Sequence, residues 1–461
     1  MFDVGLQTDN HGSPFARHLP VSNWYYPFEL SNTRLPRGLS VLEDIDWSMT
    51  RRRAAYFHIP FCDTICTFCP FTRGRYSSDD AVEDYLRALV REVQLKWPYV
   101  GKLRVDSIFI GGGTPSILNA GQIAALGDCI HTYLDTSTTT ECAAEVEVKS
   151  VTREKLLAFK QIGVTRISFG VQTFSPSFRR AFHLDAAISQ IQRVAEWVNE
   201  LFPYTNLDMI YGISGQDVEK VIADADAAIR LGTTTIDFYM LNNLSGQVKM
   251  HQELTRLGLQ RLSAKQRVEQ RRRLAQHMLE RGFARINGYS YARKRNSPSE
   301  LIQFEPNFLY HDILYGYHDD AVVGYGASAL TRAPGFNFCN ADRRETYSSW
   351  LLETGRLPMM AHDVGKAMEK GVVTFPYRGL LVKSRICWES VPQDTLEALS
   401  QLVRAGLVVE HPETFTLTEA GWLFYVNLMY FLMPGNARLW LSEEMSARIS
   451  AGHDCEATEL L

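Results

Sequence analysis

The sequence has no long apolar run, no excess of positive charge and few cysteines for its length, and each absence excludes a class of protein. Its longest apolar stretch, residues 422–433, is interrupted by Asn427 and falls short of the ~20 residues that span a bilayer. The 48 Lys and Arg are outnumbered by 52 Asp and Glu, so a net charge of −4 gives no polycationic signature for nucleic acid or membrane. Residues 1–10 contain Asp3 and Asp9 and no apolar signal-peptide core. We therefore expect a cytoplasmic protein with no nucleic-acid or membrane partner.

Eight cysteines in 461 residues are too few for a disulfide framework, and they are unevenly distributed. Three of them, Cys62, Cys66 and Cys69, fall within a short segment, and such clustering indicates a metal site. The others are isolated and are expected to be small core residues, namely Cys129, Cys142, Cys339, Cys387 and Cys455.

Residues 55–240 alternate short β-branched or aromatic runs with longer amphipathic ones, the pattern of a parallel sheet wrapped by helices. The capping candidates Ser78 and Asp79 precede apolar residues at three- and four-residue steps, so a helix is expected there. Six such repeats predict a partial barrel whose functional residues follow the carboxyl ends of the strands. The expected strands are residues 55–59, 105–110, 144–148, 166–170, 206–211 and 234–240.

The two ends of the chain have different patterns. Residues 1–50 show no periodicity, and we expect an irregular arm that covers the barrel mouth. Near the other end, a predicted helix at residues 395–404, a hairpin and an apolar helix resemble a winged-helix unit. Residues 391–441 hold two arginines against five acids, which argues against DNA binding and favours a substrate-covering role. The expected domains are the arm (1–50), a barrel with an extension (51–370) and a winged-helix-like domain (371–461).

The three clustered cysteines follow the first expected strand with the spacing C-x3-C-x2-C. Iron–sulfur clusters are usually held by four thiolates, so three cysteines leave one iron open to a ligand from outside the protein. Zinc is an alternative, but it requires four tetrahedral ligands, and the nearby His58 lies on the preceding strand. The spacing therefore favours a 4Fe-4S cluster over zinc or coincidental core cysteines.

Residues 56–71 resemble the signature loop of radical S-adenosylmethionine (SAM) enzymes, in the form found in the oxygen-independent coproporphyrinogen III oxidase (HemN-like) family. The resemblance covers roughly residues 55–435, with matching motifs in order at residues 111–116, 166–174, 206–212, 324–329 and 416–421. It implies an α/β fold, consisting of a partial (β/α)6 radical SAM barrel with an N-terminal arm and a C-terminal HemN-type winged-helix-like domain.

The resemblance also assigns roles to individual residues. It implies that Cys62, Cys66 and Cys69 bind the 4Fe-4S cluster and that two molecules of S-adenosyl-L-methionine share the barrel. Taken without it, a glycine triplet is more often a tight turn and a strand-end Asp more often a helix cap. The first SAM is expected at Tyr56, Phe68, Gly112, Gly113, Thr114 and Glu147, and the second at Gln172, Asp208, Asn243 and Leu330.

Two departures from the family pattern bear on the reaction. Members that oxidise coproporphyrinogen usually continue the loop with another cysteine, where this chain has Pro70 and Phe71. The arginine expected for the carboxylate of the second SAM is displaced or lost, and Arg179, Arg180 and His183 are candidates to replace it. These departures point to the class C methyltransferase and cyclopropanase branch, which transfers a methyl or methylene group to an unsaturated carbon of a natural product.

Other functions and partners remain open at this point. The alternatives are a coproporphyrinogen III dehydrogenase, an anaerobic haem-degrading methyltransferase and a haem chaperone. Residues 261–295 hold eleven basic and two acidic side chains, a candidate dock for a flavodoxin or ferredoxin-type electron donor, with a solvated helix face as the alternative. A pocket for an aromatic or unsaturated small-molecule substrate, or equally core packing, is expected from Tyr310, Tyr315, Tyr317, Tyr325, Phe336 and Phe338.

Overall fold

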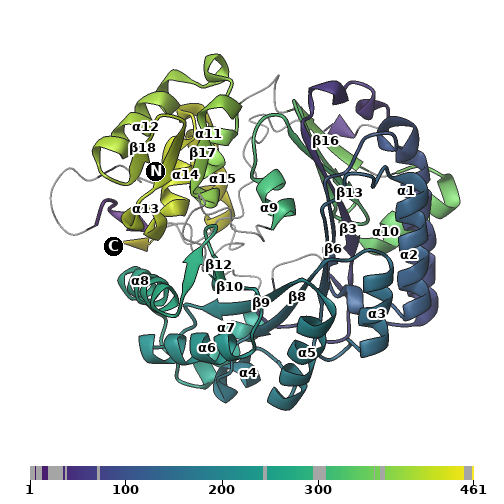
Figure 1. Ribbon diagram of the computed structural model, residues 1–461, viewed down its shortest axis with the longest axis horizontal. Helices are drawn as coiled ribbons and strands as arrows, with labels where there is room; N and C mark the ends of the chain where they lie inside the picture. The colour runs from purple at the N-terminus through teal and green to yellow at the C-terminus, as the bar shows by residue number, and fades with distance from the viewer. Residues whose placement is uncertain are drawn as a thin grey trace.

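An open α/β barrel, closed on its remaining side by the C-terminal elements, forms the body of the protein (Figure 1). The computed structural model describes residues 6, 13–18, 35–36, 39–69, 73–241, 247–293, 308–357, 359–363, 369–450 and 459–460.

Parallel strands form the centre of the main sheet, which has thirteen strands among the described residues. The six expected strands are present, although the third begins and ends earlier than the predicted residues 144–148. A seventh parallel strand, β13 (Asp320–Tyr325), pairs with the first of them. The six strands are β3 (Arg52–Ile59), β6 (Ser107–Gly112), β7 (Glu141–Val146), β8 (Arg166–Gln172), β9 (Tyr204–Tyr211) and β10 (Thr235–Met240).

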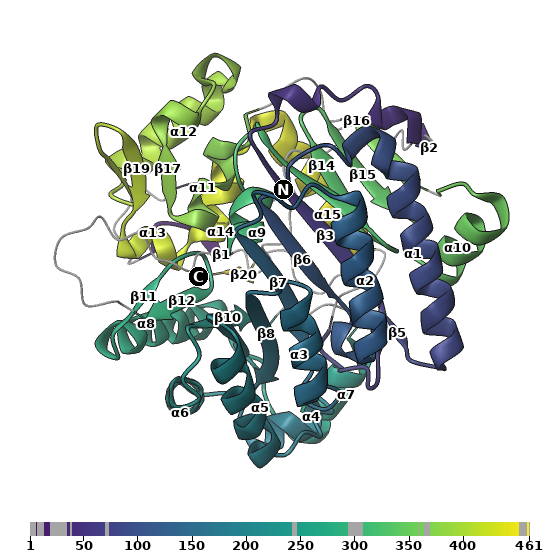
Figure 2. The same ribbon diagram turned by 45° about the vertical axis from the view of Figure 1, so that its right-hand side comes forward.

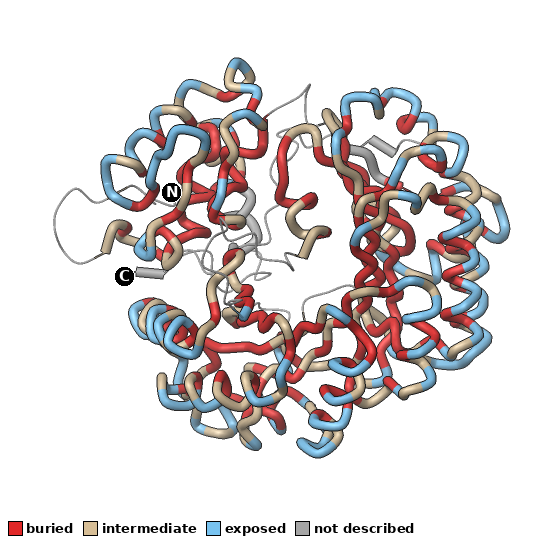
Figure 3. Tube along the Cα trace, viewed as in Figure 1, coloured by how far each residue is buried: buried red, intermediate tan, exposed pale blue. Residues whose placement is uncertain are grey.

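Amphipathic helices cover the outer face of these strands (Figures 1 and 3). The first begins where expected, because the side chain of Ser78 accepts a hydrogen bond from the backbone N–H of Ala81. Its apolar residues, Val82 and Val93 among them, are buried against the sheet, as the three- and four-residue spacing predicts. The outer helices are α1 (Asp79–Val100), α2 (Ala120–Tyr133), α3 (Arg153–Gln161), α4 (Pro176–Ala181), α5 (Ile188–Leu201), α6 (Val218–Arg230), α7 (Val248–Arg256) and α8 (Ala264–Glu280).

Antiparallel strands extend both edges of the parallel sheet, so the barrel is open rather than closed by hydrogen bonds. Beyond β10 lie β12 (Ser290–Arg293) and β11 (Phe283–Arg285). Beyond β13 lie β14 (Leu330–Ala333), β15 (Phe336–Asn340), β16 (Met359–Asp363) and β2 (Leu35–Pro36). Helix α9 (Leu309–Leu314) lies inside the ring of elements (Figure 1).

The C-terminal elements contain the expected helix and hairpin and lie across the opening of the barrel (Figures 1 and 2). The predicted helix at residues 395–404 is part of α12 (Gln393–Arg404), and β18 (Val408–Glu410) pairs antiparallel with β19 (Thr414–Leu417). The division into three domains stays a prediction. The other elements here are α11 (Gly371–Arg378), β17 (Leu380–Val382), α13 (Glu419–Leu423), α14 (Tyr425–Leu432) and α15 (Gly435–Ser450).

Residues 13–18 of the N-terminal arm pack on these C-terminal elements. The ring of Phe15 lies 5.7 Å from that of Phe424, and the Asn427 amide donates to the carbonyl of Arg17. Strand β1 (Arg17–His18) pairs with β20 (Glu459–Leu460). The two ends of the chain therefore meet beside α14. In the part of the chain that can be described, no helix combines the length and apolar character needed to cross a bilayer.

Candidate active site in the barrel

The three clustered cysteines lie on the loop that follows β3, with Cys62 in the short strand β4 (Phe61–Cys62), which pairs with β5 (Gly74–Arg75). Burial raises the pKa of the Cys62 thiol to about 11 and that of the Cys66 thiol to about 12, and the charges of Cys69 and Glu147 add to both shifts. Thiols that resist ionisation become metal ligands only beside a strong positive charge. This donor set therefore fits an iron–sulfur cluster, and the nearby Arg73 lowers the pKa of both thiols.

A single-ion site is not formed by these cysteines. Within the described ranges, no three His, Cys, Asp or Glu side chains group closely enough to hold one metal ion. In a 4Fe-4S cube each thiolate binds a different iron, so its cysteines lie farther apart than the ligands of one ion. The isolated Cys129 and Cys142 are buried as expected, whereas Cys387 is exposed, because it follows the edge of the small C-terminal sheet.

The glycine segment after β6 packs directly against the cysteine loop. Gly112 has a φ of +116°, which favours glycine, and the N–H of Gly113 donates to the carbonyl of Ile59. A Cβ on Gly113 would lie 2.7 Å from the Phe61 carbonyl oxygen and 3.0 Å from the Cys62 sulfur. The side chain of Thr114 hydrogen-bonds Cys62. Gly113 and Thr114 therefore shape the cysteine loop.

Two acids near the end of β7 lie close to the glycine segment and the cysteine loop. Glu147, the predicted acid, is near the cysteines, and its Oε2 is buried with no hydrogen-bond partner among the described residues. Glu145 accepts a hydrogen bond from the backbone N–H of Gly112 at 3.3 Å, and burial raises its pKa to about 7. The sequence analysis missed Glu145, although residues two apart on a strand share one face.

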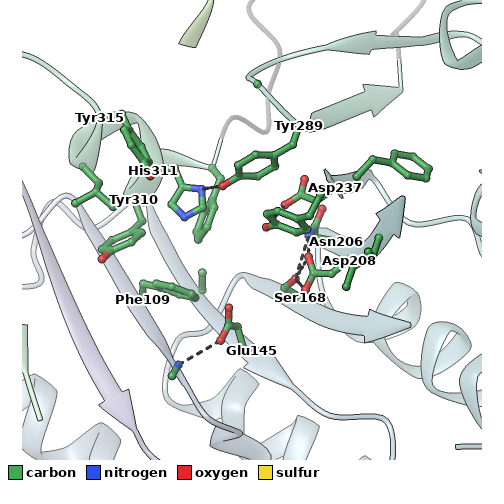
Figure 4. Close-up of a pocket in the computed structure, with 18 of the residues that line it drawn as sticks. Phe109, Glu145, Ser168, Asn206, Asp208, Asp237, Tyr289, Tyr310, His311 and Tyr315 are labelled. Atoms are coloured by element: carbon green, nitrogen blue, oxygen red, sulfur yellow. Dashed lines mark hydrogen bonds between the residues drawn. The ribbon is translucent and has the colours of Figure 1, made fainter. Parts of the chain in front are cut away.

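A cavity of about 460 Å³ lies inside the barrel and brings together six of the ten residues predicted for SAM (Figure 4). Its wall includes Tyr56, Phe68 and Gly112 from the first predicted set and Gln172, Asp208 and Leu330 from the second. Gly113, Thr114 and Glu147 are not part of this wall and lie on the side of the cysteine loop. Asn243 lies outside the described residues.

The polar floor of the cavity is built on the ends of β8 and β9. Gln172 has a φ of +69° where the pairing of β8 with β9 shifts register, so its side chain is re-aimed at the end of the strand. Asp208 accepts hydrogen bonds from Ser168 at 3.1 Å and from Asn206 at 2.8 Å. Burial raises the pKa of Asp208, and the nearby Asp237 raises it further. Ser168, Asn206 and Asp237 were not predicted.

Aromatic side chains form the opposite wall. Ring centres are 5.4 Å apart for Tyr56 and Phe109, and 4.8 Å apart for Phe109 and Tyr310 (Figure 4). Tyr310 and Tyr315 line the cavity as expected. The other expected pocket residues do not. Tyr325, Phe336 and Phe338 belong to strands of the main sheet, and Tyr317 packs against the guanidinium groups of Arg378 and Arg385.

The arginines expected to replace the missing one lie outside the cavity. Arg179 donates to the backbone carbonyls of Val171, Thr173 and Ala186, and Arg180 and His183 are exposed. The basic residues that line the cavity are instead Arg166 and Arg271, together with His58 and His311. No sequence signal separates these arginines from the others.

The predicted basic dock is not a continuous surface. Arg267 and Arg271 of α8 are buried, and Arg271 donates to the Tyr211 hydroxyl and to the Leu423 carbonyl. Arg272 and Arg273 remain exposed on the outer face of the same helix. Among the nine described basic residues of this run, Arg267 and Arg271 are buried, Arg285 is half-buried, and six are exposed: Arg261, Lys265, Arg272, Arg273, Arg281 and Arg293.

Comparisons with known proteins agree with this geometry. Residues 56–228 match the model of the radical SAM superfamily. The solved structure of coproporphyrinogen III oxidase HemN from Escherichia coli, described as a radical SAM enzyme, superposes with a TM-score of 0.71 at 20% identity, over 88% of this chain and 96% of that one.

Curated relatives align over shorter stretches. Heme chaperone HemW from Bacillus subtilis is 32% identical over 41% of this chain and 50% of its own length, and anaerobilin synthase from Escherichia coli O157:H7 is 31% identical over 42% and 44%. The chain thus spans about half the length of these relatives. Residues 56–228 are therefore similar to the radical SAM superfamily, and the chain has HemN-like relatives and the fold of HemN.

Proposed function

We propose that this protein is a class C-type radical SAM enzyme, which uses a 4Fe-4S cluster and two SAM molecules to transfer a methyl or methylene group to an unsaturated carbon of a planar natural product. The observation that carries the proposal is the single cavity, whose wall includes residues predicted for both SAM molecules. Two cofactors and a substrate must meet in one dry space for such a transfer.

Cys62, Cys66 and Cys69 would hold the cluster, with Gly113 and Thr114 fixing their loop. Bound there, the cluster and the first SAM would supply one-electron reductive cleavage and hydrogen-atom abstraction. The protein's part is to place the SAM methionine against the open iron. Glu147 supports this role, because its buried Oε2 lies beside the cysteines and has no hydrogen-bond partner among the described residues.

The first SAM is proposed to extend from the cysteine loop into the cavity along the end of β6. Gly112 allows close approach of its backbone, and the Glu145 carboxylate beside it is suited to an ammonium group. Tyr56, Phe68 and Thr114 complete the predicted set. This assignment adds Glu145 to the residues expected from sequence.

The second SAM is proposed to lie over the ends of β8 and β9. Asp208 and Gln172 offer acceptors for ribose hydroxyls, and Ser168 and Asn206 hold the Asp208 carboxylate in place. Leu330 supplies an apolar contact at the opposite side of the cavity. Asn243 completes the predicted set.

The charge of the cavity bears on the choice of substrate. Coproporphyrinogen III carries four carboxylates and needs several cations around it. The cavity wall has three carboxylates, Glu145, Asp208 and Asp237, and among its described residues only two arginines. Arg271 is already engaged by Tyr211 and Leu423. A smaller aromatic substrate between the tyrosine and phenylalanine walls suits this environment better.

Porphyrin chemistry is the second candidate, favoured by the names of the relatives, which include a heme chaperone, an anaerobilin synthase and a coproporphyrinogen oxidase. The reaction products distinguish methyl transfer from coproporphyrinogen decarboxylation and from a chaperone. Reconstituted protein with SAM, a candidate substrate and dithionite under anaerobic conditions should release both 5′-deoxyadenosine and S-adenosylhomocysteine. A coproporphyrinogen decarboxylation would yield the first without the second, and a chaperone would yield neither. Mass spectrometry of the organic product would separate methylation from cyclopropanation.

A further inference from the structure

Arg166 is a buried cation of the cavity with an unused hydrogen-bond donor. Its side chain is almost inaccessible, and Nη2 donates to the Thr235 hydroxyl at 2.9 Å. Nη1 is buried and has no hydrogen-bond partner among the described residues. The guanidinium lies over the ring of Phe308, 5.0 Å from its centre. A buried guanidinium N–H without an acceptor is costly, and the described residues leave this one open to an acceptor from a bound molecule.

His311 places a second donor beside the same ring. Its imidazole lies 4.3 Å from the centre of Phe308 and lines the cavity. Nδ1 is 3.0 Å from the Tyr289 hydroxyl and 3.1 Å from the Tyr377 hydroxyl (Figure 4). No described residue hydrogen-bonds Nε2, the nitrogen left for the cavity.

The two tyrosine hydroxyls bear on which ring nitrogen carries the proton. The Tyr377 hydroxyl donates to the Tyr289 hydroxyl at 2.9 Å. The Tyr289 hydroxyl can then donate its own hydrogen to Nδ1, 3.0 Å away. Burial, with the nearby Arg166, lowers the pKa of His311 to about 3, so the imidazole stays neutral. A neutral imidazole whose Nδ1 accepts carries its hydrogen on Nε2.

The acids of the cavity do not use these two donors. Asp208 is hydrogen-bonded to Ser168 and Asn206, and Asp237 accepts from the Tyr239 hydroxyl. Glu141, whose charge faces Arg166, instead accepts from the backbone N–H groups of Leu309 and Tyr310 and so fixes the start of α9. Arg166 and His311 therefore lie against the same ring, Phe308, in the wall of the cavity, and neither Nη1 of Arg166 nor Nε2 of His311 has a hydrogen-bond partner among the described residues.

We propose that Arg166 and His311 form a carboxylate-binding subsite around Phe308. The inference rests on the proposed function, because it assumes that this cavity binds SAM and a small substrate. The carboxylate that binds there has two possible sources, the amino-acid carboxylate of the second SAM or a carboxylate on the substrate. The first source would explain how the chain manages without the family's arginine, since Arg179, Arg180 and His183 lie away from the cavity.

Equilibrium binding to the full-length, cluster-reconstituted protein tests the subsite without any turnover. Two pairs of probes are used, and the two members of each pair differ by one carboxylate. S-adenosylhomocysteine is compared with its decarboxylated analogue, and 2-naphthoate is compared with 2-naphthylmethanol. The subsite should favour the carboxylate by at least ~10-fold in one pair or in both, as expected for a charge-assisted hydrogen bond, and the pair that responds identifies the source.

Variants assign the preference to the two residues. Arg166→Gln and His311→Phe should each reduce the carboxylate preference to about threefold or less, while affinity for the neutral probes changes little. Arg166→Lys keeps the positive charge but not the paired N–H donors of the guanidinium. It should recover part of the carboxylate preference. Tyr377→Phe removes a hydroxyl from the hydrogen-bond chain that leads through Tyr289 to Nδ1 of His311. It should weaken the carboxylate preference by a few fold. The matched controls are Arg153→Gln and His131→Gln, which alter exposed residues on the outer helices.

Each outcome bears on the proposal. A carboxylate preference that disappears in both Arg166→Gln and His311→Phe supports the subsite, even if the protein transfers no methyl group. Equal binding within both probe pairs, or a preference that survives in both variants, overturns it. If Arg166→Gln alters the thermal unfolding transition, the decision passes to Arg166→Lys and His311→Phe, whose transitions are checked in the same way.

Discussion

The backbone N–H of Gly112 donates to the carboxylate of Glu145 over 3.3 Å, which joins the carboxyl ends of β6 and β7 at the wall of the cavity. A glycine with φ of +116° and a buried acid thus form one unit beside the cysteine loop. A carboxylate held in this way is suited to bind an ammonium group and is sensitive to pH.

The Glu145 carboxyl should make SAM binding pH-dependent. Burial raises its pKa from 4.5 to about 7, so it is largely protonated below that pH and attracts a cation less. Affinity for SAM, measured by equilibrium dialysis, should rise as pH increases from 6 to 8, and Glu145→Gln should bind about 10-fold more weakly at pH 8 with a flatter profile. An unchanged profile in the variant would rule out this role.

The same shift has a consequence for stability. Between pH 4.5 and about 7 the folded protein binds the Glu145 proton that the unfolded chain releases, so this group's contribution to the free energy of unfolding decreases as pH rises through that window. Urea titrations of wild type and Glu145→Gln should differ in their pH dependence in that direction.

Cys66→Ala should abolish cluster binding. Two thiolates cannot hold the cube, so iron content and the brown absorption of reconstituted protein should be lost, together with 5′-deoxyadenosine formation. Cys387→Ala is the matched control, because Cys387 is exposed and far in sequence from the loop. Retention of the absorption in Cys66→Ala would remove the basis of the proposed function.

Gly113→Ala should disturb the cysteine loop without altering a ligand. The added Cβ would lie 2.7 Å from a backbone oxygen and 3.0 Å from the Cys62 sulfur, and the backbone oxygen cannot rotate away. We expect a loss of about 1–3 kcal/mol in the free energy of unfolding and a lower iron content. Gly121→Ala in the first turn of α2 is the control, since its nearest atom is 3.4 Å away and alanine favours helix.

Asp208→Asn should separate the two proposed SAM roles. The amide keeps the size of the side chain but removes the charge and one acceptor from the floor of the cavity. Release of S-adenosylhomocysteine should decrease by about 10-fold or more, while 5′-deoxyadenosine continues to form. Parallel loss of both products would assign Asp208 to the first SAM or to folding of the β8–β9 edge.

The exposed basic residues of α8, Arg272 and Arg273, remain a candidate contact for the electron donor. Charge reversal of Arg272 and Arg273 should slow turnover with a reduced flavodoxin and leave turnover with dithionite unchanged, with an effect that weakens at high salt. Arg271 is excluded from this test because it lies in the cavity wall. Equal loss with both donors would discard docking at this surface.

The cysteine loop and the parallel strands could be predicted from sequence, because each depends on a local pattern, whereas the residues assigned to SAM stay a prediction. The spacing of Cys62, Cys66 and Cys69 and the apolar runs of β3 to β10 are properties of short segments. Glu145 was missed in favour of Glu147, since β7 ends at Val146, earlier than the pattern predicted, and Glu147 lies beyond the strand.

Sequence alone determined that the chain forms a parallel α/β barrel with three clustered thiols at one strand end, since periodicity and spacing act over a few residues. Only the tertiary structure decided which polar groups share the cavity, because Arg166, Asp208 and His311 come from elements far apart in the chain. It also decided that Arg271 is buried while Arg272 is not, since a helix turns about 100° per residue and its packing face is set by α13 rather than by its own charges.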